Sequence, residues 1–231
     1  MENNNICLYE THLHTYPVSK CARSTVEDVI DFYKSLGYSG IFVTNHFIDG
    51  NINIDSSLPY AERIEFFFSD YEKARRLGEE AGLPVFCGVE MSHGGTDFLV
   101  YGLSKEWFLS HPEIEGMRKK KQLALLAEHG ALIIQAHPFR EAGYIDCIRL
   151  FPRQVHGVET LNACRTDFEN RMAEEYAKNY DLLPFAGTDN HLCAAMKRLG
   201  GMRSQTPITD EADFVSRVKN GQMTPFFKVL S

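Results

Sequence analysis

The 231-residue sequence lacks closely spaced cysteine pairs, long apolar runs and any excess of basic residues. Its six cysteines are scattered and none form a CxxC pair, which argues against a disulfide framework and favours a reduced, cytoplasmic protein. No apolar stretch approaches the roughly 18 residues of a membrane span. The polar segment 1–5 does not resemble a signal peptide. We therefore expect a cytoplasmic protein without membrane association.

The net charge of −7 limits the partners of the chain. Tight nonspecific binding to nucleic acid is driven by basic side chains that release counterions from phosphates, so an acidic chain argues against it. A small anionic substrate remains compatible with this charge, because bound divalent cations would offset part of it. The composition leaves open whether the chain forms an oligomer.

The sequence also has no internal repeat, low-complexity segment or linker, so we expect one domain spanning residues 1–231. Short apolar runs, typical of parallel strands covered by helices, occupy residues 40–44, 83–90, 98–102, 131–137, 155–159 and 183–189. Helical patterns with capping residues alternate with them at about 25–36, 60–81, 114–128, 167–179 and 210–220. This alternation predicts a single α/β domain.

Side chains that bind metals stand where these strands end. His12 and His14 follow a further short strand expected at residues 7–10. The other strand ends carry His46, Glu90, His137, Asp189 and His191, and Glu159 ends a further strand. In a parallel barrel all strands point the same way, so their carboxyl ends converge on one mouth. Five imidazoles and two carboxylates exceed the needs of one zinc ion and match a multinuclear site.

Five short motifs in order resemble those of the PHP (polymerase and histidinol phosphatase) superfamily. They are His12-Leu13-His14-Thr15, Thr44-Asn45-His46, Gly88-Val89-Glu90, Ala136-His137-Pro138 and Gly187-Thr188-Asp189-Asn190-His191. The resemblance covers residues 7 to about 200. It implies a distorted (β/α)7 barrel that uses two or three Mn, Fe or Zn ions, mainly to hydrolyse phosphoesters.

The resemblance also implies roles for individual residues. His12 and His14 would hold one metal with Asp189, and Glu90 would bridge it to a second metal. His137 would bind the second metal, whereas a third would be held by His46 and His191. The implied catalytic residues are His12, His14, Glu90 and Asp189.

Two segments depart from the family pattern. Many members have a carboxylate or an imidazole soon after the second His, but residues 16–23 contain neither, and water or Cys21 would have to fill that position. Members often carry a His just before the fourth strand, where this chain has Asp97, which can still bind a metal through oxygen. Asn45 replaces the usual Asp of the second motif and removes a charge but no obvious ligand.

Two arginines are candidates for substrate binding. Arg23 and Arg165 follow predicted strand ends, and a guanidinium offers the two-pronged geometry that a phosphate group accepts. Asn162 and Glu159 would line the site, through hydrogen bonds rather than direct metal ligation. His93 follows Glu90 in a glycine-containing loop, where it is either an exposed histidine or a contact to the site.

The sequence therefore predicts a phosphatase that acts on a small phosphomonoester, with histidinol phosphate as one candidate. A phosphodiesterase or nucleotidase with the same fold is the main alternative. A noncatalytic metal-binding regulatory module is a second alternative, although such a module would be expected to lack ligands. A metal-dependent amide or C–N hydrolase would need a carboxylated Lys or a different His spacing.

Overall fold

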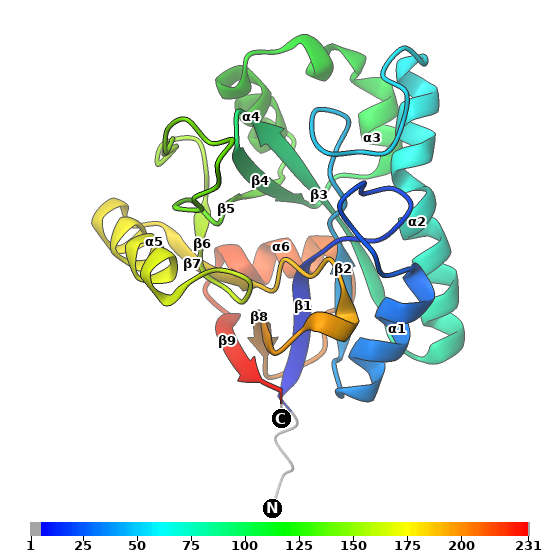
Figure 1. Ribbon diagram of the computed structural model, residues 1–231, viewed down its shortest axis with the longest axis vertical. Coiled ribbons are helices and arrows are strands. Elements are labelled where there is room, and N and C mark those ends of the chain that lie inside the picture. The colour runs from blue at the N-terminus through cyan, green and yellow to red at the C-terminus, as the bar shows by residue number, and fades with distance from the viewer. Residues whose placement is uncertain (1–5, 231) are drawn as a thin grey trace, which may run out of the picture.

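The computed structural model describes residues 6–230, within which nine strands form one sheet (Figure 1). The strands are β1 (Cys7–Leu13), β2 (Gly40–Val43), β3 (Val85–His93), β4 (Thr96–Tyr101), β5 (Leu132–Ala136), β6 (Gly157–Asn162), β7 (Leu183–Gly187), β8 (Arg198–Ser204) and β9 (Thr224–Val229). The helices are α1 (Val26–Ser35), α2 (Tyr60–Ala81), α3 (Lys105–Ser110), α4 (Lys119–Glu128), α5 (Asp167–Tyr180) and α6 (Glu211–Lys219), with 3₁₀ turns η1 (Pro112–Gly116) and η2 (Cys193–Ala195). Residues 1–5, to which the signal-peptide expectation refers, lie outside the described residues.

The sheet curls into a nearly closed barrel. Its strand order is β7-β6-β5-β4-β3-β2-β1-β8-β9, yet the segment after β7 returns to the end of β1. There the Asp189 N–H donates to the carbonyl of His12 at 2.8 Å, and the His14 N–H donates to that of Asn190 at 2.9 Å. The predicted α/β barrel is thus confirmed, while its count of seven β/α units stays a prediction.

Strand β4 runs against its neighbours, and the expectation that all the apolar runs are parallel is wrong there. It pairs antiparallel with both β3 and β5, whereas β1, β2 and β3 run parallel to one another. The cause is the turn between β3 and β4, where Gly94 and Gly95 have φ of 56° and 83°. Two adjacent residues with positive φ form a tight hairpin that reverses the chain.

Helix ends follow the capping signals in most places. The Thr25 side chain caps α1 in a capping box with Asp28, and α2 ends at Gly82 with φ 73°, as the sequence predicts. The expected helix over 114–128 is wrong at its start. Ile114 belongs to η1, and the extended backbone of Met117 and Arg118 separates η1 from α4.

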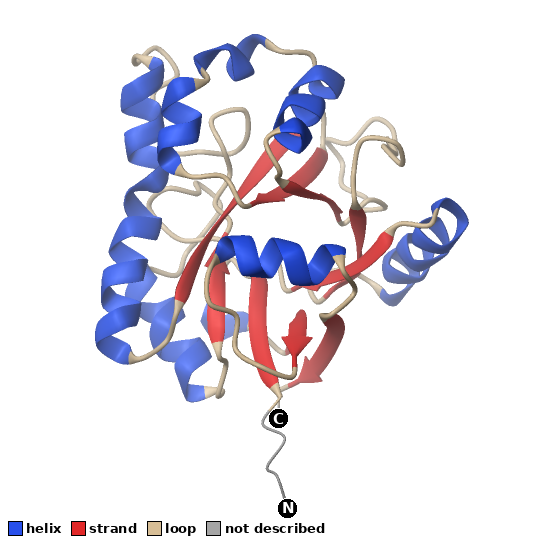
Figure 2. Cartoon of the chain, turned by 180° about the vertical axis from the view of Figure 1, so that it is seen from behind, coloured by secondary structure: helices blue, strands red, loops and turns tan. Residues whose placement is uncertain are grey.

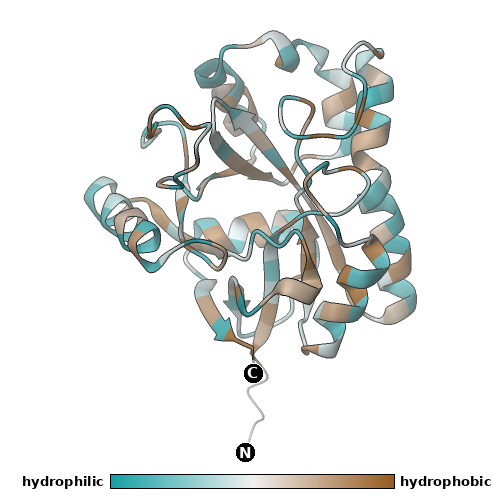
Figure 3. Cartoon of the chain, in the orientation of Figure 1, coloured by the Kyte–Doolittle hydropathy of each residue, from teal (hydrophilic) through white to brown (hydrophobic). Residues whose placement is uncertain are grey.

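Helix α6 covers one end of the barrel, as Figure 2 shows from behind. Its Phe214 is fully buried, with ring centroids 4.2 Å from Phe42 and 5.3 Å from Tyr101. Hydrophobic residues concentrate on the strands, and the helices carry both kinds of residue (Figure 3). Because this end is filled by aromatic packing, the polar strand ends gather at the other end.

None of the helices in residues 6–230 combines the length and apolar character needed to cross a bilayer.

Candidate metal centre

Eight of the predicted site residues come together at the carboxyl ends of the strands. They fall into four overlapping groups whose potential ligand atoms lie within 4.8 Å of one another: His12-His14-Glu90, His12-His137-Asp189, Glu90-Asp97-His137 and His14-His46-His191. We call these eight residues the His/Asp/Glu cluster. All are buried except His191, which is half-buried. Residues distant in sequence therefore form one compact site, as the strand-end pattern predicts.

Glu90 lies at the centre of the cluster. One carboxylate oxygen is 3.2 Å from Nε2 of His12 and 3.4 Å from Nε2 of His137. The other is 3.3 Å from Nε2 of His14 and 2.7 Å from Nδ1 of His46. A carboxylate whose two oxygens face different pairs of imidazoles is arranged as a bridge between two cations.

Several buried polar atoms of the cluster have no hydrogen-bond partner in the described structure. They are both carboxylate oxygens of Glu90, Nδ1 of His46 and Nε2 of His137. Leaving such atoms unpaired in an interior is costly, so native proteins nearly always satisfy them. Imidazole nitrogens and carboxylate oxygens are the ligands that Zn, Mn and Fe ions accept. The residues present thus fit divalent metal ions.

The backbone at two cluster residues adopts strained conformations. His137 has φ 24° and Asp189 has φ 61°, values that residues other than glycine seldom adopt. The Asp189 N–H is held by the His12 carbonyl at 2.8 Å, and the His137 N–H by Glu159 at 3.0 Å. These bonds aim the Asp189 carboxylate at His12 and His14, each with Nε2 3.5 Å from Oδ1. Strain of this kind is concentrated at functional sites.

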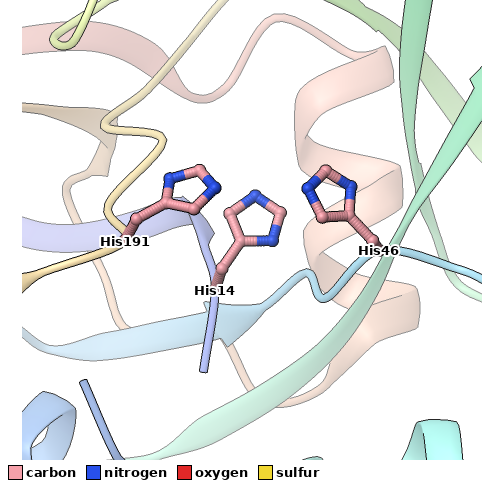
Figure 4. Close-up of side chains that lie close together, drawn as sticks. All are labelled: His14, His46 and His191. Atoms are coloured by element: carbon pink, nitrogen blue, oxygen red, sulfur yellow. The ribbon is translucent and has the colours of Figure 1, made fainter. Parts of the chain in front are cut away.

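The group His14-His46-His191 consists of three imidazoles from three separate segments (Figure 4). The His14 ring lies between the other two, with centroids 4.4 Å from His46 and 4.3 Å from His191. His14 directly follows β1, His46 follows β2 and His191 follows β7. Burial, together with the neighbouring His191 and His46, lowers the pKa of His14 well below its usual value. His14 is therefore held in the neutral form that binds metals.

His12 and Glu90 stabilise each other's charged forms within the cluster. Burial lowers the pKa of His12, but Glu159, Asp189 and Glu90 outweigh it and raise that pKa well above its usual value. Burial raises the pKa of Glu90, but His46 and His12 outweigh it and hold that pKa well below the ordinary range. A cation bound among these carboxylates would oppose protonation of His12, so metal binding would release its proton.

The thiol of Cys21 interacts with two histidines of the cluster. Burial raises the pKa of its thiol, but hydrogen bonds with His191 and His46 outweigh burial and lower the pKa to about 6.

Glu159 lies behind His12 rather than at the mouth of the barrel. Its Oε1 is 2.9 Å from Nδ1 of His12, and its Oε2 accepts bonds from the His137 N–H at 3.0 Å and the Asn162 side-chain amide at 2.9 Å. Both Glu159 and Asn162 are fully buried. Glu159 thereby orients one imidazole through its second nitrogen, the hydrogen-bonding role expected from the sequence.

We expect Glu159→Ala to weaken metal binding by His12 while the fold persists. Without the acceptor at Nδ1, the His12 ring loses its fixed orientation, and such losses cost about 10- to 100-fold in metal affinity. Competition of Mn²⁺ between the protein and a fluorescent chelator measures this change. Glu174→Ala, at an exposed position of α5, serves as the control. An affinity equal to the control's would contradict the orienting role.

Comparison with known proteins agrees with this arrangement. Residues 167–223 match the family model described as PHP-associated. The fold is similar to that of a two-domain protein containing a predicted PHP-like metal-dependent phosphoesterase from Bacteroides vulgatus ATCC 8482, with a TM-score of 0.69 and 12% identity over 97% of this chain. The chain therefore shares a PHP-like fold. It spans 66% of the length of that two-domain protein.

Two further solved structures have a similar fold. One is PsfC from Pseudomonas syringae PB-5123, with a TM-score of 0.63 and 15% identity over 98% of this chain and 93% of that chain. The other is a proposed metal-dependent phosphoesterase from Bifidobacterium adolescentis ATCC 15703, with a TM-score of 0.55 and 14% identity over 90% of this chain and 94% of that chain. No curated protein matches the chain.

The predicted arginines lie in different places on the barrel. Arg165 lines a cavity of about 380 Å³ together with Arg140, Asp189 and His191. The Nε atoms of both arginines are buried and have no hydrogen-bond partner in the described structure. Arg23 is exposed, and its guanidinium donates to backbone carbonyls of its own loop. The cavity therefore favours Arg165, with Arg140, for contact with an anion beside the cluster.

Asp97 and His93 both lie next to the turn of the β3–β4 hairpin, where His93 pairs with Thr96 and Asp97 with Ser92. Asp97 is buried in β4, with Oδ2 2.8 Å from Arg140 and 3.9 Å from Nε2 of His137. His93 is the last residue of β3 and is exposed, with its ring against Phe151. Asp97 thus reaches the cluster and positions Arg140, whereas His93 lies on the surface.

Glu10 is a buried carboxylate beneath the cluster to which the sequence analysis assigns no role. It accepts bonds from the N–H groups of Thr11, His12 and Thr188 at 2.9, 2.9 and 3.0 Å, and from the hydroxyls of Tyr33 and Thr188. Burial raises its pKa to about 7 against these hydrogen bonds. The signal in the sequence is a lone carboxylate inside an otherwise apolar strand, two residues before His12.

Proposed function

We propose that this chain is a metal-dependent phosphoesterase that hydrolyses a small phosphomonoester with two or three divalent ions in the His/Asp/Glu cluster. The observation that carries the proposal is Glu90, a buried carboxylate whose two oxygens each face two imidazole nitrogens within 3.4 Å. A noncatalytic module would be expected to have lost part of such a set. The likeness to PHP-fold structures supports the same conclusion.

The proposed ligands follow the groups of the cluster. His12, His14 and Asp189 would hold one ion, and Glu90 would join it to a second ion held by His137 and Asp97. His46 and His191 would hold a third. Bound Mn, Fe or Zn ions would supply Lewis-acid charge for the phosphoryl oxygens and would lower the pKa of water at the site.

The chain's own residues would bind and orient the ester. The unpaired Nε–H groups of Arg140 and Arg165 line the cavity beside Asp189 and His191, where they can donate to phosphate oxygens. Asp97 holds Arg140 in place through its carboxylate. Glu159 keeps His12 directed at the cluster. Histidinol phosphate is one candidate among the small monoesters that this site would accept.

Hydrolysis of a substrate panel tests the proposal. Protein purified and loaded with Mn²⁺ is assayed against phosphomonoesters and phosphodiesters, with His12→Ala as the inactive reference. Faster release of phosphate from monoesters supports the proposal, and preference for diesters favours the phosphodiesterase alternative. Turnover no faster than that of His12→Ala would overturn both, and fewer than two metal equivalents would favour a noncatalytic module.

We expect Arg165→Met to raise KM for a phosphomonoester while leaving the metal content unchanged. A hydrogen bond to a charged group contributes about 1.5–3 kcal/mol, which corresponds to a rise of roughly 10- to 100-fold. Steady-state kinetics and metal quantitation measure the two quantities separately. Arg171→Met, at an exposed position of α5, is the matched control. An unchanged KM for Arg165→Met would remove Arg165 from the binding site.

A further inference from the structure

Residues 16–23 contain no carboxylate or imidazole, but their Ser19 contacts two histidines of the cluster. Its Oγ is 3.2 Å from Nδ1 of His14 and accepts a bond from the His46 N–H at 3.0 Å. The same Oγ is 2.8 Å from Oδ1 of Asn45. All four residues are buried. A hydroxyl has one proton to donate and two positions that accept, so these three contacts use its full capacity.

The orientation of the Asn45 amide decides the direction of these bonds. The backbone N–H of Thr15 reaches one end of the amide at 2.7 Å, and because a backbone N–H can only donate, that end is the oxygen. The other end, Nδ2, donates to the Thr15 hydroxyl at 2.8 Å, which in turn donates to Asp70 at 2.8 Å. Since Oδ1 of Asn45 carries no hydrogen, the Ser19 hydroxyl donates to it. The single proton of Ser19 is thereby used.

The Ser19 oxygen can therefore only accept from His14. We infer that Ser19, held by Asn45, is a positioning residue that keeps a proton on Nδ1 of His14 and so leaves Nε2 to bind a metal, a role that rests on the metal centre of the proposed function. Nε2 lies 3.3 Å from Oε2 of Glu90 and 3.5 Å from Oδ1 of Asp189, on the side of the cluster. A ring with its proton on Nε2 would donate to these carboxylates and could not bind a metal through that nitrogen.

The position of the proton in the metal-free wild type tests the inference without any substitution. Long-range proton–nitrogen NMR of histidine-labelled protein distinguishes a protonated ring nitrogen from an unprotonated one, with the His14 signals assigned through the backbone. Near neutral pH we expect Nδ1 of His14 to carry a proton and Nε2 to carry none. An unprotonated Nδ1, or a mixture of the two tautomers, would overturn the inference.

Two substitutions test the direction of the bonds by the same NMR measurement. Ser19→Ala removes the acceptor at Nδ1 of His14, so part of the protein should carry the proton on Nε2 instead. Asn45→Ala leaves Ser19 in place but frees its hydroxyl to donate to Nδ1, so the second tautomer should appear here as well. Ser69→Ala, at an exposed position of α2, is the control and should match wild type. Wild-type tautomers in both folded variants would overturn the inference.

Metal competition separates this inference from the proposed function. With Zn²⁺ and a chelator, we expect Ser19→Ala to lose affinity for at least one equivalent by about 10- to 100-fold, the usual cost of removing a partner that orients a ligand. Ser69→Ala should bind as wild type does. Unchanged affinity in Ser19→Ala would overturn the role of Ser19 and leave the metal-dependent phosphoesterase intact. Failure of wild type to bind any zinc would overturn both.

Discussion

Glu90→Gln should lower the kcat of phosphomonoester hydrolysis by about a thousandfold or more and reduce the bound metal. The substitution keeps the shape of the side chain but replaces one carboxylate oxygen with an NH2 group, which cannot bind a cation. Each Glu90 oxygen faces two imidazoles, so its loss affects both ions that the carboxylate would bridge. A bound metal supplies several kcal/mol of transition-state charge stabilisation, and each 1.36 kcal/mol corresponds to tenfold in rate.

The measurement combines kcat with metal quantitation on the same preparations. Glu80→Gln, on the exposed face of α2 where Glu80 pairs with Arg76, is the matched control and should retain both rate and metal. Thermal unfolding of the metal-free proteins checks that Glu90→Gln is folded. A folded Glu90→Gln protein that keeps its metal and its rate would show that Glu90 is not a bridging ligand.

Glu10→Ala should lower the free energy of unfolding of the metal-free protein by about 4 kcal/mol or more. The substitution leaves three backbone N–H groups and two hydroxyls without their acceptor in the barrel interior. Each unsatisfied buried donor costs about 1–3 kcal/mol. Because these donors lie on β1, α1 and the segment after β7, the loss acts where the barrel closes.

Urea denaturation at constant pH measures the change in unfolding free energy. Glu128→Ala, at the exposed end of α4, is the control and should stay within about 0.5 kcal/mol of wild type. A Glu10→Ala protein as stable as this control would mean that water or a shifted strand replaces the acceptor.

The same residue carries a pH dependence that Glu10→Gln should remove. Burial raises the pKa of Glu10 from 4.5 to about 7, so the folded state favours the protonated form. Its contribution to stability is fully present below pH 4.5 and is lost as the pH rises through about 7. Gln does not ionise, so the stability of Glu10→Gln relative to wild type should rise by about 3 kcal/mol across this interval. A constant difference would contradict the raised pKa.

Local signals predicted some elements well and others poorly. Helix α2 matches its predicted range at both ends. Its C-terminal end was predictable because Gly82 provides the left-handed residue that ends a helix. Strand β4 was predicted with the wrong direction, since its apolar composition reflects burial on both faces and carries no information about direction. The start of α4 was also missed, because the buried Ile114 of η1 continues the helical spacing without continuing the helix.

The cluster itself was predictable because the residues that form it end successive strands, and a barrel brings strand ends together. Glu10 and Arg140 were harder to recognise. Their importance depends on hydrogen-bond partners from distant segments, such as Thr188 for Glu10 and Asp97 for Arg140. Cys21 could be named from the sequence only as one way to fill a missing position.

The sequence by itself determined the chemical types of the site residues and their order along the chain. Apolar strands that end at His, Glu and Asp are recognisable from residue type and spacing, which do not depend on the fold. The tertiary structure decided which of these groups face one another. Closure of the barrel brings Asp189 to His12, centres Glu90 among four imidazoles and brings the segment after β1 to His46 and His191. These are contacts between distant segments, which depend on packing and strand register rather than on local sequence.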